Sequence, residues 1–300
     1  MKTKTYLFAL MTMALTLGSC SDNENGIGGE TSKYITVSTS IGNMTRVATD
    51  EKGGQTFEEG DEISVYAWTG DATVAPETRE RVVNNAINKL TNGSWVSTPQ
   101  MLWKNNRDKH YFIGVYPISA ISDLSAGEYT FDETKQVESD LLVAVNKDGL
   151  SYNVDEQQTV PLTFTHVMAK LVVNLTYKNQ WGGIPTVEKV VVGNAAKEAT
   201  INYLTKVVTP STTAKEDFSL PEITENTKYV SVIIPQEDVK QLTIVIGGKN
   251  FVYDNGTPFK LESGKITTVN LEVGRDEIKL GDVKITDWEN GSTFSGEALN

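Results

Sequence analysis

The feature that most constrains the fold of this chain is an alternation of apolar and polar residues with a period of two. In Tyr34–Ile41, for example, Ile35, Val37 and Ile41 fall on one side of an extended segment, and Lys170–Tyr177 repeats the pattern. Successive side chains of a strand point to opposite faces, so this period predicts half-buried β-strands. Gly, Asn, Asp and Pro separate the runs, which favours an antiparallel all-β fold. The other runs are Ile63–Trp68, Tyr111–Tyr116, Leu141–Val145, Thr159–Phe164, Glu188–Val192, Tyr229–Ile234, Leu242–Ile246, Asn250–Tyr253 and Ile266–Val273.

Two short segments bear on how strands are connected. Gly247-Gly248 predicts a tight hairpin between two of the runs. Thr78–Leu90 has apolar residues at helical spacing, and Asn92-Gly93 after it suits either a helix cap or a type I′ turn. We favour the hairpin, because alternation resumes at Trp95.

The N-terminus has the layout of a lipoprotein signal peptide. Lys2 and Lys4 precede an apolar run, Tyr6–Leu17, which is too short to span a bilayer and is typical of a secretory segment. Leu17-Gly18-Ser19-Cys20 resembles the bacterial lipobox, in which the cysteine is acylated and becomes the new N-terminus. We therefore expect residues 1–19 to be removed and Cys20 to carry a lipid that anchors the chain in the outer membrane.

Charge and cysteine content narrow the classes of partner. Loss of residues 1–19 leaves 25 Lys and Arg against 39 Asp and Glu, a net charge of −14. Such an acidic chain repels nucleic acid and anionic lipid head groups. Cys20 is the only cysteine, so no disulfide is expected and stability must come from burial.

The chain divides into a tether and two halves. Residues 20–33 are rich in Gly, Asn and acidic residues and are expected to form a flexible tether. Tyr111–Pro117 and Tyr229–Pro235 share a layout of tyrosine, apolar strand and proline, which fits two sandwich domains of similar plan. We place the boundary between residues 165 and 166, giving domains 34–165 and 166–300.

Five segments, taken in order, resemble the fimbrillin family of Bacteroidales, the fimbrial subunits and their fimbrillin-like relatives. The most specific is Leu162–Leu171, with the sequence LTFTHVMAKL. The other four are Phe57–Tyr66, Tyr111–Pro117, Val232–Gln236 and Lys284–Glu289. The resemblance spans residues 34 to 290 and implies two tandem β-sandwich domains with transthyretin-like topology. It also implies a non-enzymatic, adhesive component of surface fimbriae, without a cofactor, whose partners are other fimbrial subunits.

The resemblance implies assembly by strand donation. In that scheme the subunit reaches the surface as a lipoprotein, and a trypsin-like protease cuts after an arginine in the first strand region. The groove left by the released segment then takes a strand from the next subunit by β-augmentation. Arg46 in Asn43-Met44-Thr45-Arg46-Val47 matches the cleavage position, so the mature chain would begin at Val47. Alternatively, Arg46 is an ordinary solvated arginine and Cys20 stays as a permanent anchor, as in some relatives.

The candidate donor strand lies near the C-terminus. Ile278 and Leu280, then Val283 and Ile285, alternate across Gly281-Asp282. The other interpretation is that these residues form the last strand of the second half's own sheet. Only about a dozen residues follow Trp288, which favours a minor, tip or anchor component over the bulk shaft subunit.

No catalytic or metal-binding constellation is present. The two histidines, His110 and His166, lie far apart and do not have zinc-ligand spacing. We expect His166 to be structural, with a partly buried imidazole that bonds the backbone at the junction of the halves, and His110 to be exposed.

The alternative function is that of a glycan-binding surface lipoprotein. Tandem sandwiches of this class bind sugars on exposed aromatic platforms. Trp68, Trp103 and Trp181 are candidates, and Trp181 in the Trp181-Gly182-Gly183 segment is the best of them. Tryptophans that pack in the core or cover strand ends would exclude this use.

Overall fold

The described part of the chain is almost entirely β-structure, which confirms the expected fold class. The computed structural model describes residues 33–42, 56–156, 158–254 and 256–288. The helical elements within these ranges are two single 3-10 turns, η1 (Thr78–Glu80) and η2 (Asn179–Trp181). No helix among the described residues is long and apolar enough to cross a membrane.

The first half of the chain is built on a seven-stranded sheet with the order β1-β8-β7-β5-β2-β3-β4. Its strands are β1 (Thr36–Ile41), β2 (Glu62–Thr69), β3 (Arg81–Thr91), β4 (Ser94–Thr98), β5 (His110–Tyr116), β7 (Leu142–Leu150) and β8 (Thr159–His166). The sheet curls until its two edge strands meet, and Trp95 Nε1 of β4 donates a hydrogen bond to Thr39 Oγ1 of β1 over 2.9 Å. The curl encloses one apolar core, which includes Val65, Phe112 and Phe164.

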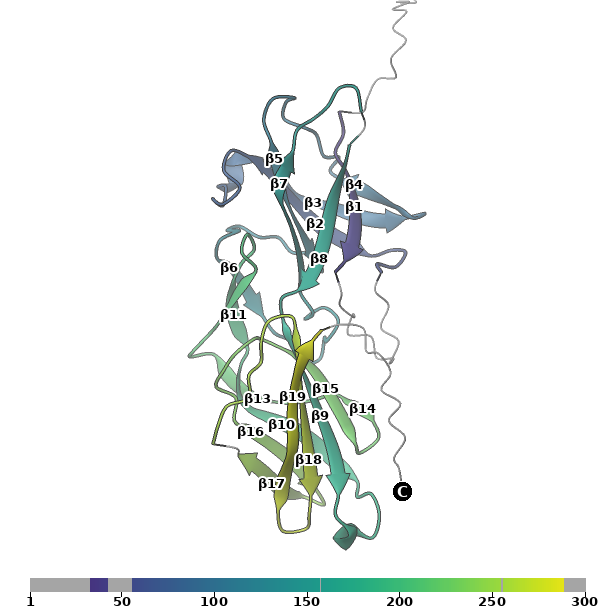
Figure 1. The fold of residues 1–300 in the computed structure, drawn as a ribbon, viewed down its shortest axis with the longest axis vertical. Coiled ribbons are helices and arrows are strands. Elements are labelled where there is room, and N and C mark those ends of the chain that lie inside the picture. The colour runs from purple at the N-terminus through teal and green to yellow at the C-terminus, as the bar shows by residue number, and fades with distance from the viewer. Residues whose placement is uncertain (1–32, 43–55, 157, 255, 289–300) are drawn as a thin grey trace, which may run out of the picture.

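The second half is a sandwich of a five-stranded sheet, β14-β15-β9-β18-β19, and a four-stranded sheet, β13-β10-β16-β17 (Figure 1). The first sheet contains β9 (Ala169–Tyr177), β14 (Glu222–Thr224), β15 (Lys228–Ile233), β18 (Lys265–Val273) and β19 (Ile278–Asp287). The second sheet contains β10 (Val187–Ala196), β13 (Lys215–Ser219), β16 (Gln241–Ile246) and β17 (Lys249–Asp254).

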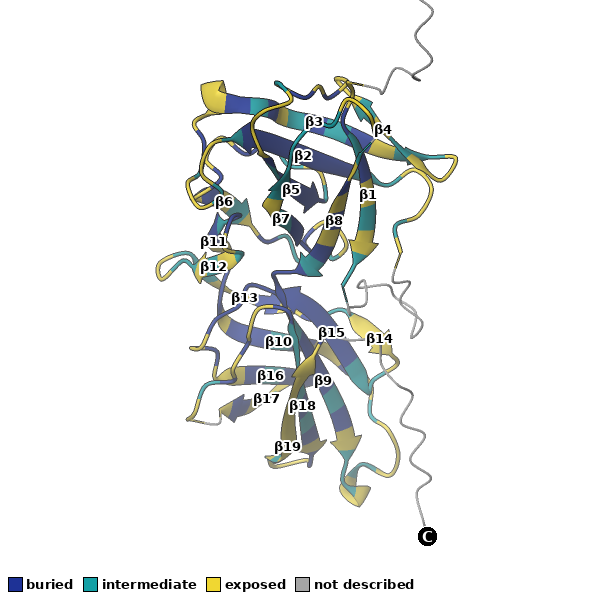
Figure 2. Ribbon diagram, turned by 45° about the horizontal axis from the view of Figure 1, so that its top comes forward, coloured by how far each residue is buried: buried dark blue, intermediate teal, exposed yellow. Residues whose placement is uncertain are grey.

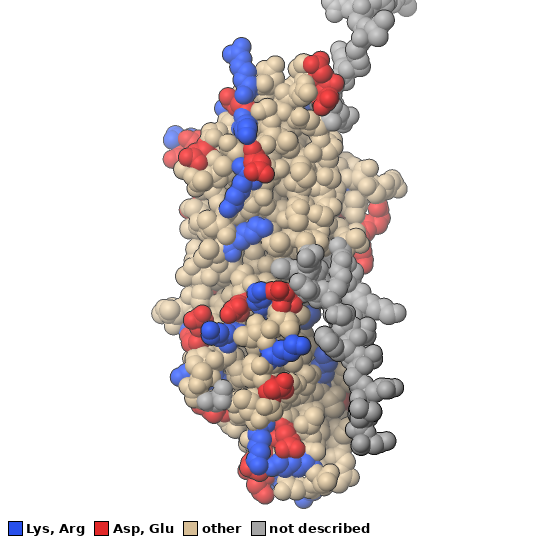
Figure 3. All heavy atoms as spheres, in the orientation of Figure 1, with Lys and Arg blue, Asp and Glu red and all other residues tan. Residues whose placement is uncertain are grey.

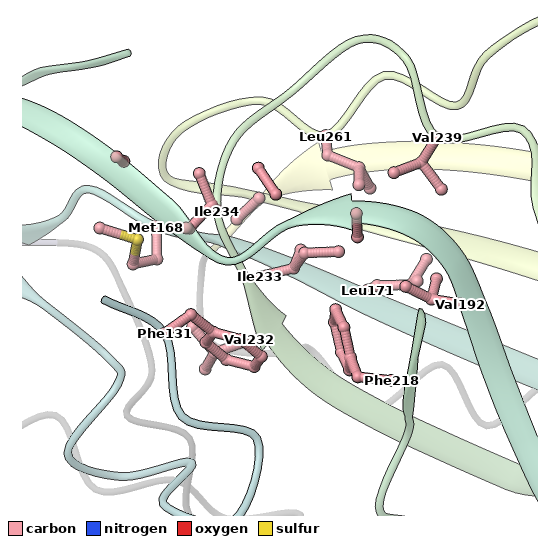
Figure 4. Close-up of a cluster of buried hydrophobic side chains, with 14 of the residues drawn as sticks. Phe131, Met168, Leu171, Val192, Phe218, Val232, Ile233, Ile234, Val239 and Leu261 are labelled. Carbon is pink, nitrogen blue, oxygen red and sulfur yellow. The ribbon is translucent and has the colours of Figure 1, made fainter. Parts of the chain in front are cut away.

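Alternation along these strands builds the core of the sandwich. Leu171, Val173 and Leu175 of β9 are at most 3% exposed, and Val190 and Val192 of β10 are fully buried. Figure 4 shows Leu171, Val192, Phe218 and Val232 pointing into one such cluster. The period-two pattern therefore places these side chains as predicted.

A third, three-stranded sheet joins the two halves. It consists of β6 (Gly127–Thr130), β11 (Glu198–Asn202) and β12 (Val207–Pro210), in the order β12-β11-β6. β6 belongs to the first half of the sequence and pairs antiparallel with β11 of the second. Figure 1 shows β6 and β11 beside each other where the two halves meet.

The apolar core also crosses from one half to the other. Tyr66 and Trp68 of β2 belong to the same buried cluster as Val173 of β9. Phe131, from the connection between β5 and β7, packs against Phe218 of β13 with ring centroids 5.0 Å apart. The first half therefore contributes side chains to the core of the second.

Two expectations about strand pairing have clear outcomes. The hairpin at Asn92-Gly93 is confirmed: both residues have positive φ, at 51° and 73°, and they join β3 to β4. The all-antiparallel expectation is wrong for two pairs, because β1 runs parallel to β8 and β9 parallel to β18. Parallel neighbours need long crossover connections, so a local pattern of turn residues does not reveal them.

Candidate assembly site

The first feature of the site is the edge strand β1. Among the described strands its ladder partner is β8, in parallel register from Thr36 opposite Thr159 to Ile41 opposite Phe164. On the outer face, the hydroxyls of Thr36 and Thr159 lie 3.2 Å apart, and so do those of Ser40 and Thr163.

The inner face of β1 closes the first-half core. Ile35 and Val37 are 2% and 6% exposed, in the same cluster as Leu162 and Phe164 of β8. Val37 of β1 and Ile35 just before it thus fill an apolar space, while the exposed residues of β1 face outward (Figure 2). If β1 left, the space would become a groove lined by apolar side chains.

A second chain segment pairs with the three residues just before β1. Ile35 N–H donates to the Met101 carbonyl over 3.0 Å, and Trp103 N–H donates to the Lys33 carbonyl over 3.2 Å. An isolated bridge pairs Tyr34 with Leu102 between these two bonds. β1 therefore pairs with β8 along its length, and the three residues just before it pair on their other side with Met101–Trp103. Such open main-chain edges are what β-augmentation uses.

The predicted processing and lipidation residues lie outside the described residues. These are Cys20, Arg46 and Val47. The last described main-chain bond of this region runs from Gly42 N–H to the Phe164 carbonyl over 2.8 Å. Arg46 follows Gly42 in the sequence within a few residues, so a cut there would separate β1 from the rest of the chain.

The candidate donor residues lie on β19, which pairs with β18 at the edge of the five-stranded sheet. Ile278 and Leu280 pack partly against the core, whereas Val283 and Ile285 are 38% and 39% exposed. Figure 2 shows the contrast between the exposed β19 and the buried residues of β10. In this structure the segment forms the last strand of its own sheet; its donation to another subunit stays a prediction.

His166 has a structural environment at the junction, but its partner differs from the one expected. Its Nδ1 lies 2.6 Å from Asp140 Oδ1, and both side chains are at most 3% exposed. The imidazole is therefore fully buried and bonds a carboxylate instead of the backbone. Asp140 immediately precedes the β7 region, so the pair ties the end of β8 to the start of β7.

The expectation that His110 is exposed is wrong, because the side chain is fully buried. Its Nε2 accepts a hydrogen bond from Lys104 N–H over 3.0 Å, and Nδ1 lies 3.1 Å from the Asp108 carbonyl. These bonds suit a neutral imidazole that donates from Nδ1. Burial lowers the pKa of His110. The charged turn after Trp103 folds back over the ring, which the local sequence does not reveal.

The three candidate tryptophans have different environments. Trp68 and Trp103 are 2% and 8% exposed, so they are core residues and present no platform. Trp181 in η2 is half-buried; its Nε1 donates to the Val273 carbonyl over 2.9 Å, and its ring contacts Phe251. Glycan binding at Trp181 stays a prediction.

Charged side chains of the described residues are paired or dispersed. Lys197 Nζ lies 2.9 Å from Glu133 Oε2, linking the two halves, and Lys89 Nζ lies 3.0 Å from Glu62 Oε1. On the face seen in Figure 3, acidic and basic side chains are interspersed over the second half. No group of three or more potential metal ligands is found among the described residues.

The family model described as fimbrillin-like matches residues 45–288. The chain belongs to the fimbrillin-like family. The match includes four of the five segments that carried the resemblance and all of Lys284–Glu289 except its last residue, and it begins one residue before Arg46. Membership supports a role as a subunit of cell-surface fimbriae that assembles with other fimbrial subunits.

Solved structures show the same fold. A candidate cell-adhesion protein from Bacteroides ovatus is 18% identical, with a TM-score of 0.61 over 85% of this chain and 98% of its own. One from Bacteroides uniformis is 18% identical, with a TM-score of 0.59 over 85% and 98%. A fimbrial protein from Bacteroides vulgatus is 12% identical, with a TM-score of 0.54 over 86% and 100%. No curated protein matches this fimbrillin-like chain significantly.

Two parts of the site were missed from the sequence. The segment Met101–Trp103 pairs with the residues just before β1, yet it has no alternation long enough to mark it as strand-like. Trp288 stacks on His166 with ring centroids 4.0 Å apart. His166 and Trp288 each lie in a segment that resembles the fimbrillin family, which marked both residues as of interest. Nothing in the sequence around either residue indicated that the two side chains are in contact.

Proposed function

We propose that this chain is a structural and adhesive component of surface fimbriae that is delivered as a lipoprotein through Cys20. Its assembly site is the slot that β1 fills. Proteolysis at Arg46 would remove β1 together with the lipidated N-terminus, and a strand from a neighbouring subunit would take its place.

The observation that carries the proposal is the position of residues 33–41 over an apolar core, with β8 paired along β1 and Met101–Trp103 paired with the residues just before it. Ile35 and Val37 fill that core, and β8 and Met101–Trp103 supply hydrogen-bonding edges. An incoming strand with apolar residues at alternate positions would recover both kinds of contact. The vacated edge would otherwise leave backbone groups and apolar side chains in water.

The decisive test is the N-terminus of the chain on surface fimbriae. Mass spectrometry or Edman sequencing of that material should find Val47 as the first residue. Acylated Cys20 on every molecule would contradict cleavage. Arg46→Ala should block maturation, Arg46→Lys should still be cut by a trypsin-like protease because it keeps a basic side chain, and Arg79→Ala is the control at an exposed arginine.

Strand donation itself has a separate readout. Processed subunits should form polymer ladders that resist sodium dodecyl sulfate at room temperature, and Arg46→Ala should abolish the ladder. The donor candidates are Ile278, Leu280, Val283 and Ile285. Replacing Val283 and Ile285 by Asp should abolish the ladder if β19 is donated, because charged side chains would have to enter the apolar groove. An intact ladder would assign the donor to another segment.

A further inference from the structure

The last strand of the second half is held in its sheet by pairing with β18 and buries few side chains along most of its length. All residues of β19 from Gly281 to Asp287 are exposed, and among the described strands its ladder partner is β18. A β-bulge interrupts that ladder between the pair Val269–Val283 and the pair Leu271–Leu280. Ladder bonds that are open to water and lack apolar cover are the ones that open most readily.

The next residue, Trp288, is fully buried. Its ring stacks on the imidazole of His166, with centroids 4.0 Å apart and planes 12° from parallel. Lys170 Nζ lies 5.5 Å from the centroid of the indole. Trp288 N–H also donates to the Gly264 carbonyl over 3.1 Å, which continues the hydrogen bonding of β19 by one residue.

The partner of Trp288 is itself firmly held. His166 ends β8 in the first half, and the hydrogen bond between its Nδ1 and Asp140 Oδ1 is buried. Lys170, two residues into β9, has a pKa lowered by burial, an effect that Asp140 opposes. Trp288 thus docks on His166 at the junction between the halves as well as on Lys170 of β9, a strand of its own sheet.

The indole Nε1 of Trp288 and the Nε2 of His166 are buried without a hydrogen-bond partner among the described residues. The contact is therefore made by ring faces and burial, not by the indole N–H. A different aromatic ring at position 288 should preserve most of it.

We propose that Trp288 is the lock that keeps β19 in the sheet of its own subunit, and that donation of β19 begins with withdrawal of this ring from His166. The consequence for assembly rests on the proposed function, but the lock itself is a property of the single chain.

Hydrogen–deuterium exchange of the monomeric secreted chain, with β1 in place, tests the lock. In Trp288→Ala, amides of residues 278–287 should exchange faster by on the order of tenfold or more, while those of β5 and β7 keep their rates. In Trp288→Phe, the exchange rates of these amides should stay close to those of the unsubstituted chain, because phenylalanine keeps an aromatic ring and loses only the unpaired indole N–H. Trp181→Ala, at a half-buried tryptophan that contacts Phe251, is the matched control and should leave the amides of residues 283–287 unchanged.

His166→Asn gives a second test should Trp288→Ala fail to fold. Asparagine has a side-chain amide to donate to Asp140 but no ring for Trp288 to stack on, so the same local rise in exchange is expected. Unchanged exchange over residues 278–287 in the folded variants would overturn the proposal, and so would an equal rise in every sheet. The measurement needs neither lipid, cleavage nor polymer. Its failure would leave the proposed fimbrial function standing, and a failed ladder assay would leave the lock standing.

Discussion

Individual side chains of the first-half core leave little free space beside the strand that the assembly scheme would remove. Gly114 in β5 faces Phe164 of β8, and a Cβ at that position would lie 2.6 Å from Phe164 Cζ. Phe164 in turn contacts Phe57, with ring centroids 5.1 Å apart. The requirement for glycine at position 114 is therefore a packing requirement set by a residue 50 positions away in the chain.

Gly114→Ala should lower the free energy of unfolding by about 1–3 kcal/mol, because the added methyl overpacks the core. Gly42→Ala is a matched control beside the same strand, since its Cβ would meet neighbours at 3.5 Å, an ordinary contact distance. We expect the control to change the free energy by less than about 0.5 kcal/mol. Denaturant titration measures both, and equal effects would show that Phe164 moves aside without cost.

Buried tyrosines predict how stability depends on alkaline pH. Burial raises the pKa of Tyr177 to about 12, and it raises the pKa of Tyr129 and Tyr203 further. A phenol whose pKa is higher in the folded chain than the ordinary 10.0 stabilises the fold fully below that pH. The contribution is lost as pH rises from about 10 toward the folded pKa.

The denaturant concentration at the midpoint of unfolding should therefore be independent of pH near neutrality and decrease steadily above pH about 10. Phenolate absorbance should lag behind that of a tyrosine peptide until the chain unfolds. A folded chain in which all tyrosines titrate together at their ordinary pKa would contradict the burial of these hydroxyls.

At the scale of elements, edge strands have unequal roles in this fold. β1 and the residues just before it contribute two buried side chains, Ile35 and Val37, and pair with β8 and with Met101–Trp103, whereas β19 contributes little burial apart from its two ends. β19 also carries Lys279, Lys284 and a bulge, features that discourage unwanted pairing at a sheet edge. Replacement of β1 should therefore matter more for stability than loosening of β19.

Ile35→Ala should lower the free energy of unfolding of the unprocessed chain by roughly 2–5 kcal/mol, because it removes a side chain that is 2% exposed. Ile118→Ala is the control at an isoleucine that is 46% exposed, where the change should stay within about 0.5 kcal/mol. If the two variants have the same free energy of unfolding, the segment formed by Ile35 and β1 does not support the core, and a groove left by its removal would not serve as an assembly site.

At the scale of the whole molecule, the two halves are joined by more than the chain. The sheets change between β8 and β9, close to the predicted boundary at residues 165 and 166, which stays a prediction. However, β6 pairs with β11 across the halves, and Gln136 Oε1 accepts a hydrogen bond from Val232 N–H over 2.8 Å. The connection between β5 and β7 thus completes the second half.

Residues 166–300 expressed alone should not unfold cooperatively, because they lack Phe131 and the pairing of β6. The intact chain should show one cooperative transition by circular dichroism, and residues 166–300 should show a broad, non-cooperative signal or aggregate. A sharp transition of the isolated second half would contradict this dependence and support two independent domains.

The sequence by itself determined the class of fold, the position of most strands, the hairpins at Asn92-Gly93 and Gly247-Gly248, and the family. These features are local: side-chain period, positive-φ turn residues and short motifs are all properties of neighbouring residues. The short strands β6, β11 and β12, which join the two halves, were not predicted.

Only the tertiary structure decided the parallel pairing of β1 with β8, the burial of His110 and the stack of Trp288 on His166. Each depends on segments that are distant in sequence or on a loop that folds back, and no local propensity encodes which surfaces meet. The residues on which assembly would depend were visible in the sequence one at a time. Two arrangements followed from long-range packing: the seating of β1 over the first-half core, and the contact of Trp288 with His166. Such packing reduces the exposed apolar surface of the whole chain.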